Sequence, residues 1–439
     1  MSSASIEEIE FALISWGLDA ATYIDSHRGN ISVRNFAAGW EVTKKTKDTA
    51  TIEYIPFRAG IEWRENLGVA RELGKLVSWS AAQLALSDLL RAHGPSPVWV
   101  EELPTEMTIA LVLLLPFVGG FDGTRPTVSV DRERLPSRVT ECVTLLSSAE
   151  RYSTRWVIPL APEIDSPIEL EANVFLTTQS PEDLVWSLNL DILRPPNHAG
   201  FTVAPSQYRY AVLEVLHGDN PEGELTERYG RLLDSALALT MAQPVLPAGY
   251  FSALRLPPPP TGSLSESRHV ALSPSSQQWS RTLIDEFTRA WHAVQNAPNP
   301  IKLALRRLAR TVERSVPEDT TIDLMIAAEA LYLSKDEGEL SYRLSLRAAL
   351  WLDASSPEEC LKTMKLFQSA YSMRSKVAHG NTLKPDDEIQ LRETNDQVLR
   401  VLKVACWKAL EASAQGKWPP KWDELVFQKD ASADRPSCL

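Results

Sequence analysis

The spacing of apolar residues changes about two thirds of the way along the 439-residue chain. Beyond residue 275 the apolar positions recur every three or four residues, as they do on the buried face of a helix. Only short polar turns separate these segments, which favours helices packed as antiparallel neighbours. The pattern predicts an all-α bundle with helices at residues 280–294, 301–316, 322–333, 340–352, 357–379 and 387–412.

The first 250 residues mix helical and strand-like patterns. Residues 41–56 alternate in polarity around a polar turn and predict a β-hairpin, whereas residues 66–92 and 224–241 predict helices. This mixture is typical of an α+β region, and a division into two subdomains near residue 150 is compatible with it. Strand-like runs are found at residues 98–101, 108–115, 156–160, 168–177, 185–193 and 201–204.

A proline-rich segment separates the two patterns. Consecutive prolines at residues 257–260 lead into a serine-rich stretch, a composition typical of a semi-rigid spacer between folded units. We therefore predict a multidomain α+β protein with a mixed N-terminal region at 1–253, a Pro/Ser-rich linker at 254–275 and an all-α domain at 276–439.

The predicted helix at residues 357–379 has the clearest boundaries. Ser356 suits the N-cap, Pro357 the first helical position and Glu359 the third, which together form a capping box. Gly380 suits the left-handed residue that commonly ends a helix. The last turns of this helix can therefore be assigned position by position.

Those last turns contain Arg374 and His379. Arginine stays protonated in proteins and can hold a phosphate, whereas histidine titrates near neutrality and can move a proton. Together they suffice to cleave a phosphodiester that carries its own nucleophile, which is RNA. Their spacing corresponds to about 140° around a helix and about 7.5 Å along it, so a two-fold dimer would focus them better than one helix. Taken alone, the pair also fits a surface arginine and a histidine at a helix C-terminus.

Two upstream segments add weight to this pair. Residues 319–332 read DTTIDLMIAAEALY and residues 339–349 read ELSYRLSLRAA. Followed by YSMRSKVAHG at 371–380, this order resembles the Apea-like branch of the HEPN superfamily over the predicted all-α domain. The resemblance implies a helical bundle that dimerises and a metal-independent ribonuclease with an R-x(4–6)-H motif, formed here by Arg374 and His379.

Neighbouring residues are candidates for supporting or RNA-binding roles. Ser375 follows the motif arginine where many active members of the family carry Asn, Asp or His, and its hydroxyl can also hydrogen-bond a phosphate. Tyr371 and Lys376 flank the same arginine, and the lysine adds positive charge to the motif helix.

A charged residue in the helix predicted at 322–333 needs a partner. Glu329 lies within a nearly all-round apolar pattern, where a carboxylate is unfavourable unless paired. Arg343 and Arg347 lie four positions apart and share one face of the next helix. We expect an ion pair between Glu329 and one of these two arginines; alternatively, the arginines line the RNA groove.

Charge is shared unevenly along the chain. Residues 281–439 contain 23 Lys+Arg and 23 Asp+Glu, whereas residues 1–280 contain 22 and 34, so the net charge of −12 lies in the first part. An acidic region repels phosphate and binds nucleic acid poorly. The helix predicted at 301–316 carries a basic stripe, which is either a solvated face or an RNA contact: Lys302, Arg306, Arg307, Arg310 and Arg314.

Composition argues against several other classes of protein. A hydrophobic content of 44% and a charged content of 23% are typical of soluble globular proteins. The N-terminus lacks a signal pattern, and the most apolar window, residues 107–121, is too short to span a bilayer. The cysteines are scattered without a C-x-x-C pair, as in reduced cytosolic proteins. We therefore expect a cytoplasmic protein without membrane association, metal or cofactor.

The leading hypothesis is a metal-independent RNA endonuclease that leaves 2′,3′-cyclic phosphate ends. By resemblance it is a homodimeric prokaryotic effector of antiphage defence or abortive infection, with a sensor in the N-terminal region and a phage-derived trigger or an antitoxin as partner. A second hypothesis is a noncatalytic HEPN module that binds RNA or protein and dimerises. A third assigns the chemistry to the N-terminal region, where no motif supports it.

Overall fold

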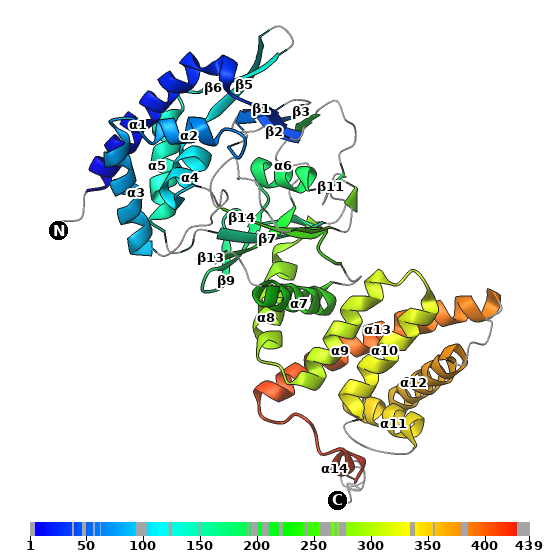
Figure 1. Ribbon diagram of the computed structural model, residues 1–439. Coiled ribbons are helices and arrows are strands. Elements are labelled where there is room, and N and C mark those ends of the chain that lie inside the picture. Colours follow the sequence, from blue (N-terminus) through cyan, green and yellow to red (C-terminus); the bar gives the residue numbers. More distant parts are fainter. Residues whose placement is uncertain are drawn as a thin grey trace, which may run out of the picture. The chain divides into compact units, whose positions relative to one another are not determined.

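Two compact units make up the computed structural model (Figure 1). The first contains residues 1–222 and 248–277, and the second contains residues 223–247 and 278–439. Helices and antiparallel strands are both present, which confirms the predicted α+β class. The structure describes residues 5–36, 39–45, 50–55, 58–61, 63–93, 103–122, 125–148, 150, 152–190, 193–194, 201–203, 210–218, 223–241, 245–254, 265–267, 270–271, 278–333, 339–353, 356–378 and 385–427.

The first unit begins with a layer of helices around one apolar core. In α1 (Ile6–Ser26), Ser5 and Glu8 each accept the other's backbone N–H and so form a capping box. The buried Trp16 donates from Nε1 to the carbonyl of Leu73 at 3.3 Å, which attaches α2 to α1. The other helices of this layer are η1 (Arg28–Asn30), α2 (Leu67–Leu73), α3 (Trp79–His93), α4 (Thr105–Ile109), the π-helical η2 (Ala110–Leu114) and α5 (Leu135–Leu146).

A six-stranded antiparallel sheet follows this layer in the sequence. Its strand order is β15-β14-β7-β13-β10-β9. β7 (Tyr152–Ile158) and β13 (Ala211–His217) pair along their whole length near the centre. Nearly every residue of β7 is buried, as expected for a strand covered on both faces. The other strands are β9 (Ile168–Glu171), β10 (Val174–Thr178), β14 (Gly249–Leu254) and β15 (Ser265–Ser267).

A charged cluster lies at the centre of this sheet. Arg155 of β7 lies 3.0 Å from Asp183 of α6 (Pro181–Asn189) and 2.8 Å from Glu214 of β13. Burial alone would lower the pKa of Arg155, but the charges of Asp183 and Glu214 outweigh it and the pKa is raised. The cluster therefore joins α6 to both central strands.

Smaller sheets complete the first unit. β2 (Gly39–Lys45) pairs antiparallel with β3 (Ala50–Ile55), which confirms the hairpin predicted at residues 41–56. β12 (Phe201–Val203) adds to the other side of β3. Further pairs are β1 (Val33–Phe36) with β4 (Arg58–Ile61), β5 (Phe117–Asp122) with β6 (Arg125–Val130), and β11 (Leu193–Arg194) with β16 (Val270–Ala271). The chain also contains β8 (Ala161–Pro162) and β17 (Gln278–Trp279).

Two predicted strands are helices in the structure. Residues 108–115 run through α4 and η2, most of whose residues are buried. The apolar run has no periodicity, so its pattern did not distinguish a buried helix from a buried strand. Residues 185–193 overlap α6, which begins with a capping box formed by Ser180 and Asp183. The strand predicted at 98–101 lies outside the described residues.

The second unit is built from helices around α10 (Pro317–Tyr332) (Figure 1). α10 contacts α9, α11, α12 and α13. Its buried residues form one broad face, whereas Ile322, Ile326 and Glu329 on the other side are half-buried, so burial is less than the nearly all-round apolar pattern predicted. The helices predicted between residues 280 and 412 are present as α8 (Arg281–Gln295), α9 (Asn299–Arg310) with η3 (Thr311–Glu313), α10, α11 (Leu340–Asp353), α12 (Pro357–Ala378) and α13 (Pro385–Ala414), and α14 (Trp422–Phe427) follows.

One helix from the predicted N-terminal region belongs to the second unit. α7 (Gly223–Thr240) packs on α8 and α9, and its Tyr229 stacks on Trp291 of α8 with ring centroids 6.3 Å apart. The units therefore do not divide at residue 253, because α7, which ends at Thr240, packs on helices that begin only at Arg281. Most of the predicted linker at 254–275 lies outside the described residues, and its described parts form β15 and β16.

Candidate functional site

α12 carries the predicted motif arginine near its C-terminal end. The helix begins as predicted, since the backbone N–H of Glu359 donates to Oγ of Ser356 at 3.3 Å. Ala370 is buried against the bundle. Arg374 follows one turn later, with 32% of its side chain exposed. His379, the other motif residue, lies outside the described residues, which end in this helix at residue 378.

Arg374 lies between a carboxylate and an aromatic ring. Its Nη2 is 3.7 Å from Oε1 of Glu329 in α10. Its guanidinium carbon is 5.7 Å from the ring centroid of Tyr371, one turn earlier on α12. The ion pair is longer than a direct hydrogen bond, and the Glu329 side chain is 27% exposed. Among the residues that the structure describes, these two neighbours orient the guanidinium, whose N–H donors can also serve an anion.

The prediction of an ion pair between Glu329 and α11 is wrong. We expected Arg343 or Arg347 of α11, whereas the structure pairs Glu329 with Arg374 of α12. The reason is geometric: α10 packs against α12 as well as α11, and Glu329 lies within ion-pair distance of α12. The observed ion pair joins Arg374, predicted as the motif arginine, to Glu329, predicted as a carboxylate in need of a partner.

Arg347 and Arg343 occupy different environments on α11. Arg347 donates from Nη1 to the carbonyl of Tyr332, the last residue of α10, at 2.8 Å. Its guanidinium also lies 5.5 Å from the ring centroid of Trp422. A cation at a helix C-terminus is favourable, so these contacts give Arg347 a structural role. Arg343 lies one turn earlier and is half-buried.

The two residues that follow Arg374 lie in the last turn of α12. Ser375 is half-buried and Lys376 is exposed. An exposed lysine next to Arg374 adds positive potential at this end of the helix without burying a charge. Their predicted roles toward RNA remain predictions.

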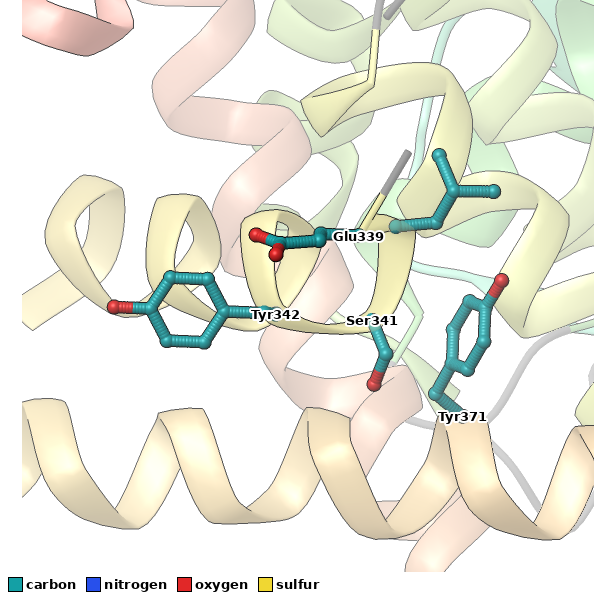
Figure 2. Close-up of a pocket in the computed structure, with 5 residues that line it drawn as sticks. Glu339, Ser341, Tyr342 and Tyr371 are labelled. Carbon is teal, nitrogen blue, oxygen red and sulfur yellow. The ribbon is translucent and has the colours of Figure 1, made fainter. Parts of the chain in front are cut away.

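An open hollow of about 850 Å³ lies beside Tyr371 (Figure 2). Its other described lining residues are Glu339, directly before α11, and Leu340, Ser341 and Tyr342 in its first turn. Figure 2 shows Ser341 directed toward α12 and the ring of Tyr371 extending toward the first turn of α11. The sequence reasoning had not assigned Glu339, Ser341 or Tyr342 to the site, because their proximity to Tyr371 depends on how α11 packs on α12. The available sequence signal was a tyrosine in each of the segments 339–349 and 371–380, namely Tyr342 and Tyr371.

Most residues of the basic stripe predicted on α9 form contacts with other helices of the bundle. Arg307 and Arg314 each lie 2.8 Å from a different oxygen of Asp323, whose side chain is 2% exposed. Lys302 donates from Nζ to the last carbonyl of α8 at 2.9 Å. These three residues therefore stabilise helix packing, whereas Arg306 and Arg310, the other residues of the stripe, are exposed.

Several ionisable groups that do not belong to this site are buried. Burial raises the pKa of the Cys142 and Cys406 thiols to about 12, which makes both poor nucleophiles near neutral pH. Lys403 of α13 is also buried and donates to the carbonyl of Met241. Within the described ranges, no group of three or more His, Cys, Asp or Glu is arranged to hold a metal ion. No helix in the described part of the chain combines the length and apolar character needed to cross a membrane.

Comparison with known proteins adds no relative to this picture. No protein-family model matches the sequence, and neither curated proteins nor solved structures gave a match. The resemblance to Apea-like HEPN domains therefore rests on the residues of the chain itself.

Proposed function

We propose that this protein is a metal-independent RNA endonuclease whose site contains Arg374 and His379. The position of Arg374 carries the proposal: it is half-exposed at the end of α12, oriented by Glu329 and in contact with Tyr371, which lines an open hollow. A guanidinium in this setting can bind a phosphate through two parallel N–H donors. His379 follows the last helical residue of α12 directly in the sequence, so it can supply proton transfer near the same phosphate.

In the proposed reaction, the 2′-oxygen of RNA forms a bond to the adjacent phosphorus and the bond from phosphorus to the 5′-oxygen breaks. His379 accepts the proton of the 2′-hydroxyl, and the same histidine of a second copy donates a proton to the leaving 5′-oxygen. Arg374 stabilises the negative charge on the phosphorane oxygens. The products carry a 2′,3′-cyclic phosphate and a 5′-hydroxyl, and DNA is inert because it lacks the nucleophile. The site is complete only in a homodimer.

The resemblance to Apea-like HEPN proteins extends the proposal to biology. We assign the protein to prokaryotic antiphage defence, as a toxin or abortive-infection effector that acts in the cytoplasm. Its acidic first unit is then a regulatory sensor that responds to a phage-derived trigger or an antitoxin. Because negative charge repels phosphate, RNA contacts are assigned to the second unit.

The test compares wild type with Arg374→Ala and His379→Ala on total RNA in the presence of EDTA, with analysis of the fragment ends. Arg392→Ala is the matched control, since Arg392 is an exposed arginine on α13 paired with Glu388. We expect cyclic-phosphate ends from wild type and control, and a loss of about 10²- to 10³-fold for each motif variant. Equal cleavage by all four proteins would contradict the proposal.

A noncatalytic HEPN module is the alternative, and the ion pair between Arg374 and Glu329 favours it, because it gives the arginine a partner within the fold. In that case RNA stays intact with every variant. Arg374→Ala would then alter the dimer or its binding to RNA or protein, which size-exclusion chromatography and RNA-binding assays measure.

A further inference from the structure

The hollow beside Tyr371 is formed by two helices that pack against each other. Glu339 directly precedes α11, and its carbonyl accepts the N–H of Arg343 at 3.0 Å. Its backbone φ of 44° lies in the left-handed region, which is uncommon for a residue other than glycine. The helix start therefore holds Glu339 at a defined place on the rim of the hollow, and Figure 2 shows its carboxylate on the same side of α11 as the Tyr342 ring.

The lining combines aromatic rings with polar groups. Tyr342 is 51% exposed and Tyr371 is half-buried, so each offers part of its ring to a ligand. Leu340 is 36% exposed and adds an apolar edge, while Ser341 adds a hydroxyl. Unpaired RNA bases are commonly bound by stacking on aromatic side chains together with hydrogen bonds to their base edges. This combination suits a planar, polar ring better than a flexible aliphatic chain.

The carboxylate of Glu339 matches the hydrogen-bonding edge of only one of the four RNA bases. A carboxylate is an acceptor with two oxygens, and guanine presents two adjacent donors, N1–H and the N2 amino group, on its pairing edge. Adenine and cytosine place an acceptor next to their amino group, and uracil flanks its single N–H with two carbonyls, so each brings a repelling oxygen or nitrogen to the carboxylate. Complementary hydrogen bonding therefore favours guanine.

The hollow adjoins the proposed phosphate site through one residue. Tyr371 lines the hollow and also lies 5.7 Å from the guanidinium carbon of Arg374. We propose that the hollow binds an unpaired guanine of RNA next to the phosphate held by Arg374, with Tyr342 stacking on the base and Glu339 accepting from its edge. This inference deepens the proposed ribonuclease function and rests on it.

The test measures binding, so that it does not require cleavage. Full-length protein is titrated into fluorescein-labelled oligouridine or the same strand with one central guanosine, both carrying 2′-fluoro groups that remove the attacking hydroxyl. We expect the guanosine strand to bind about tenfold more tightly, as for a bidentate base contact. Tyr342→Ala weakens binding of this strand about tenfold, as for a lost stacking partner. Glu339→Gln removes most of the difference between the strands.

Matched controls lie on α13, away from the hollow. Ile389→Ala replaces another exposed large side chain (60% exposed) and Glu393→Gln another exposed carboxylate. Both are expected to bind as wild type does, and melting curves check the fold of every variant. A further arm replaces the strand with free guanosine monophosphate, which is expected to bind much more weakly because it lacks neighbouring phosphates.

The outcomes separate this inference from the proposed function. Guanine-dependent binding that needs Glu339 and Tyr342, without any cleavage, would retain the base site and reject the nuclease. Cleavage that needs Arg374, with equal binding of both strands, would retain the nuclease and overturn the base site. Absence of RNA binding by wild type, or tight binding of the free nucleotide that depends on Glu339, would also overturn it.

Discussion

Arg155 in the first unit and Arg374 in the second are both paired with carboxylates, yet their surroundings differ. Arg155 lies at 3.0 and 2.8 Å from two carboxylates with 21% of its side chain exposed. Arg374 lies 3.7 Å from one carboxylate, is 32% exposed and contacts Tyr371, which lines an open hollow. The charge of Arg155 is neutralised within the fold, whereas Arg374 keeps donors for an external anion. The number and distance of the carboxylates thus distinguish a structural arginine from a candidate functional one.

The largest effect is expected from Arg155→Ala. It leaves Asp183 and Glu214, whose side chains are 10% and 19% exposed, close together without the cation between them. We expect a loss of about 3–5 kcal/mol in the free energy of unfolding, as for the breaking of a buried ion pair. Urea unfolding followed by tryptophan fluorescence measures it. A loss as small as that of the exposed control Arg392→Ala would remove the contrast with Arg374.

The buried Lys403 of α13 should make the stability of the protein depend on pH. Burial lowers the pKa of Lys403 to about 8, so between about pH 8 and the ordinary lysine value near 10.4 the unfolded chain binds more protons than the folded chain. Stability therefore rises with pH across this window. Relative to Lys403→Met, we expect the unfolding free energy of wild type to increase by about 2 kcal/mol between pH 7.5 and 10. If the free energy of unfolding changes with pH in the same way in both proteins, the pKa of Lys403 is not depressed.

A smaller effect on stability is expected from Glu329→Gln, which removes the charge that orients Arg374. The pair is partly exposed, so the free energy of unfolding should change by less than about 1 kcal/mol. Cleavage of RNA should fall about tenfold, because the guanidinium is less well oriented for the phosphate. Urea unfolding and initial cleavage rates measure the two quantities. A large loss of stability with unchanged cleavage would make the pair structural, like that of Arg155.

The smallest effect is expected at the buried thiols. With pKa values raised to about 12, Cys142 and Cys406 have almost no thiolate at pH 8. Cys142→Ser and Cys406→Ser should therefore leave the stoichiometry of alkylation by iodoacetamide unchanged in the folded protein, as measured by mass spectrometry. Rapid labelling of either cysteine under native conditions would indicate that its surroundings open readily.

Local patterns predicted the helical unit well and the first unit less well. The start of α12 at Pro357 follows from its N-cap serine, and the central place of α10 in the bundle follows from its apolar pattern. In the first unit, the run at 108–115 was predicted as a strand because continuous apolar residues carry no period. α1 and β13 were not predicted at all, although the capping box at Ser5 was a visible signal for α1.

In the candidate site, the sequence identified individual residues but not the contacts between them. Arg374, Tyr371 and Glu329 were named from the sequence, but their mutual contacts were not, and neither was the part played by Glu339 and Tyr342 in the hollow. Cap signals and periodicity depend on residues a few positions apart, so the sequence by itself determined most helix boundaries of the second unit and the candidate motif on α12. Only the tertiary structure decided that Glu329 faces Arg374 and that α11 brings Tyr342 to the same hollow as Tyr371. Those contacts depend on how helices distant in the chain pack together, which no local pattern specifies.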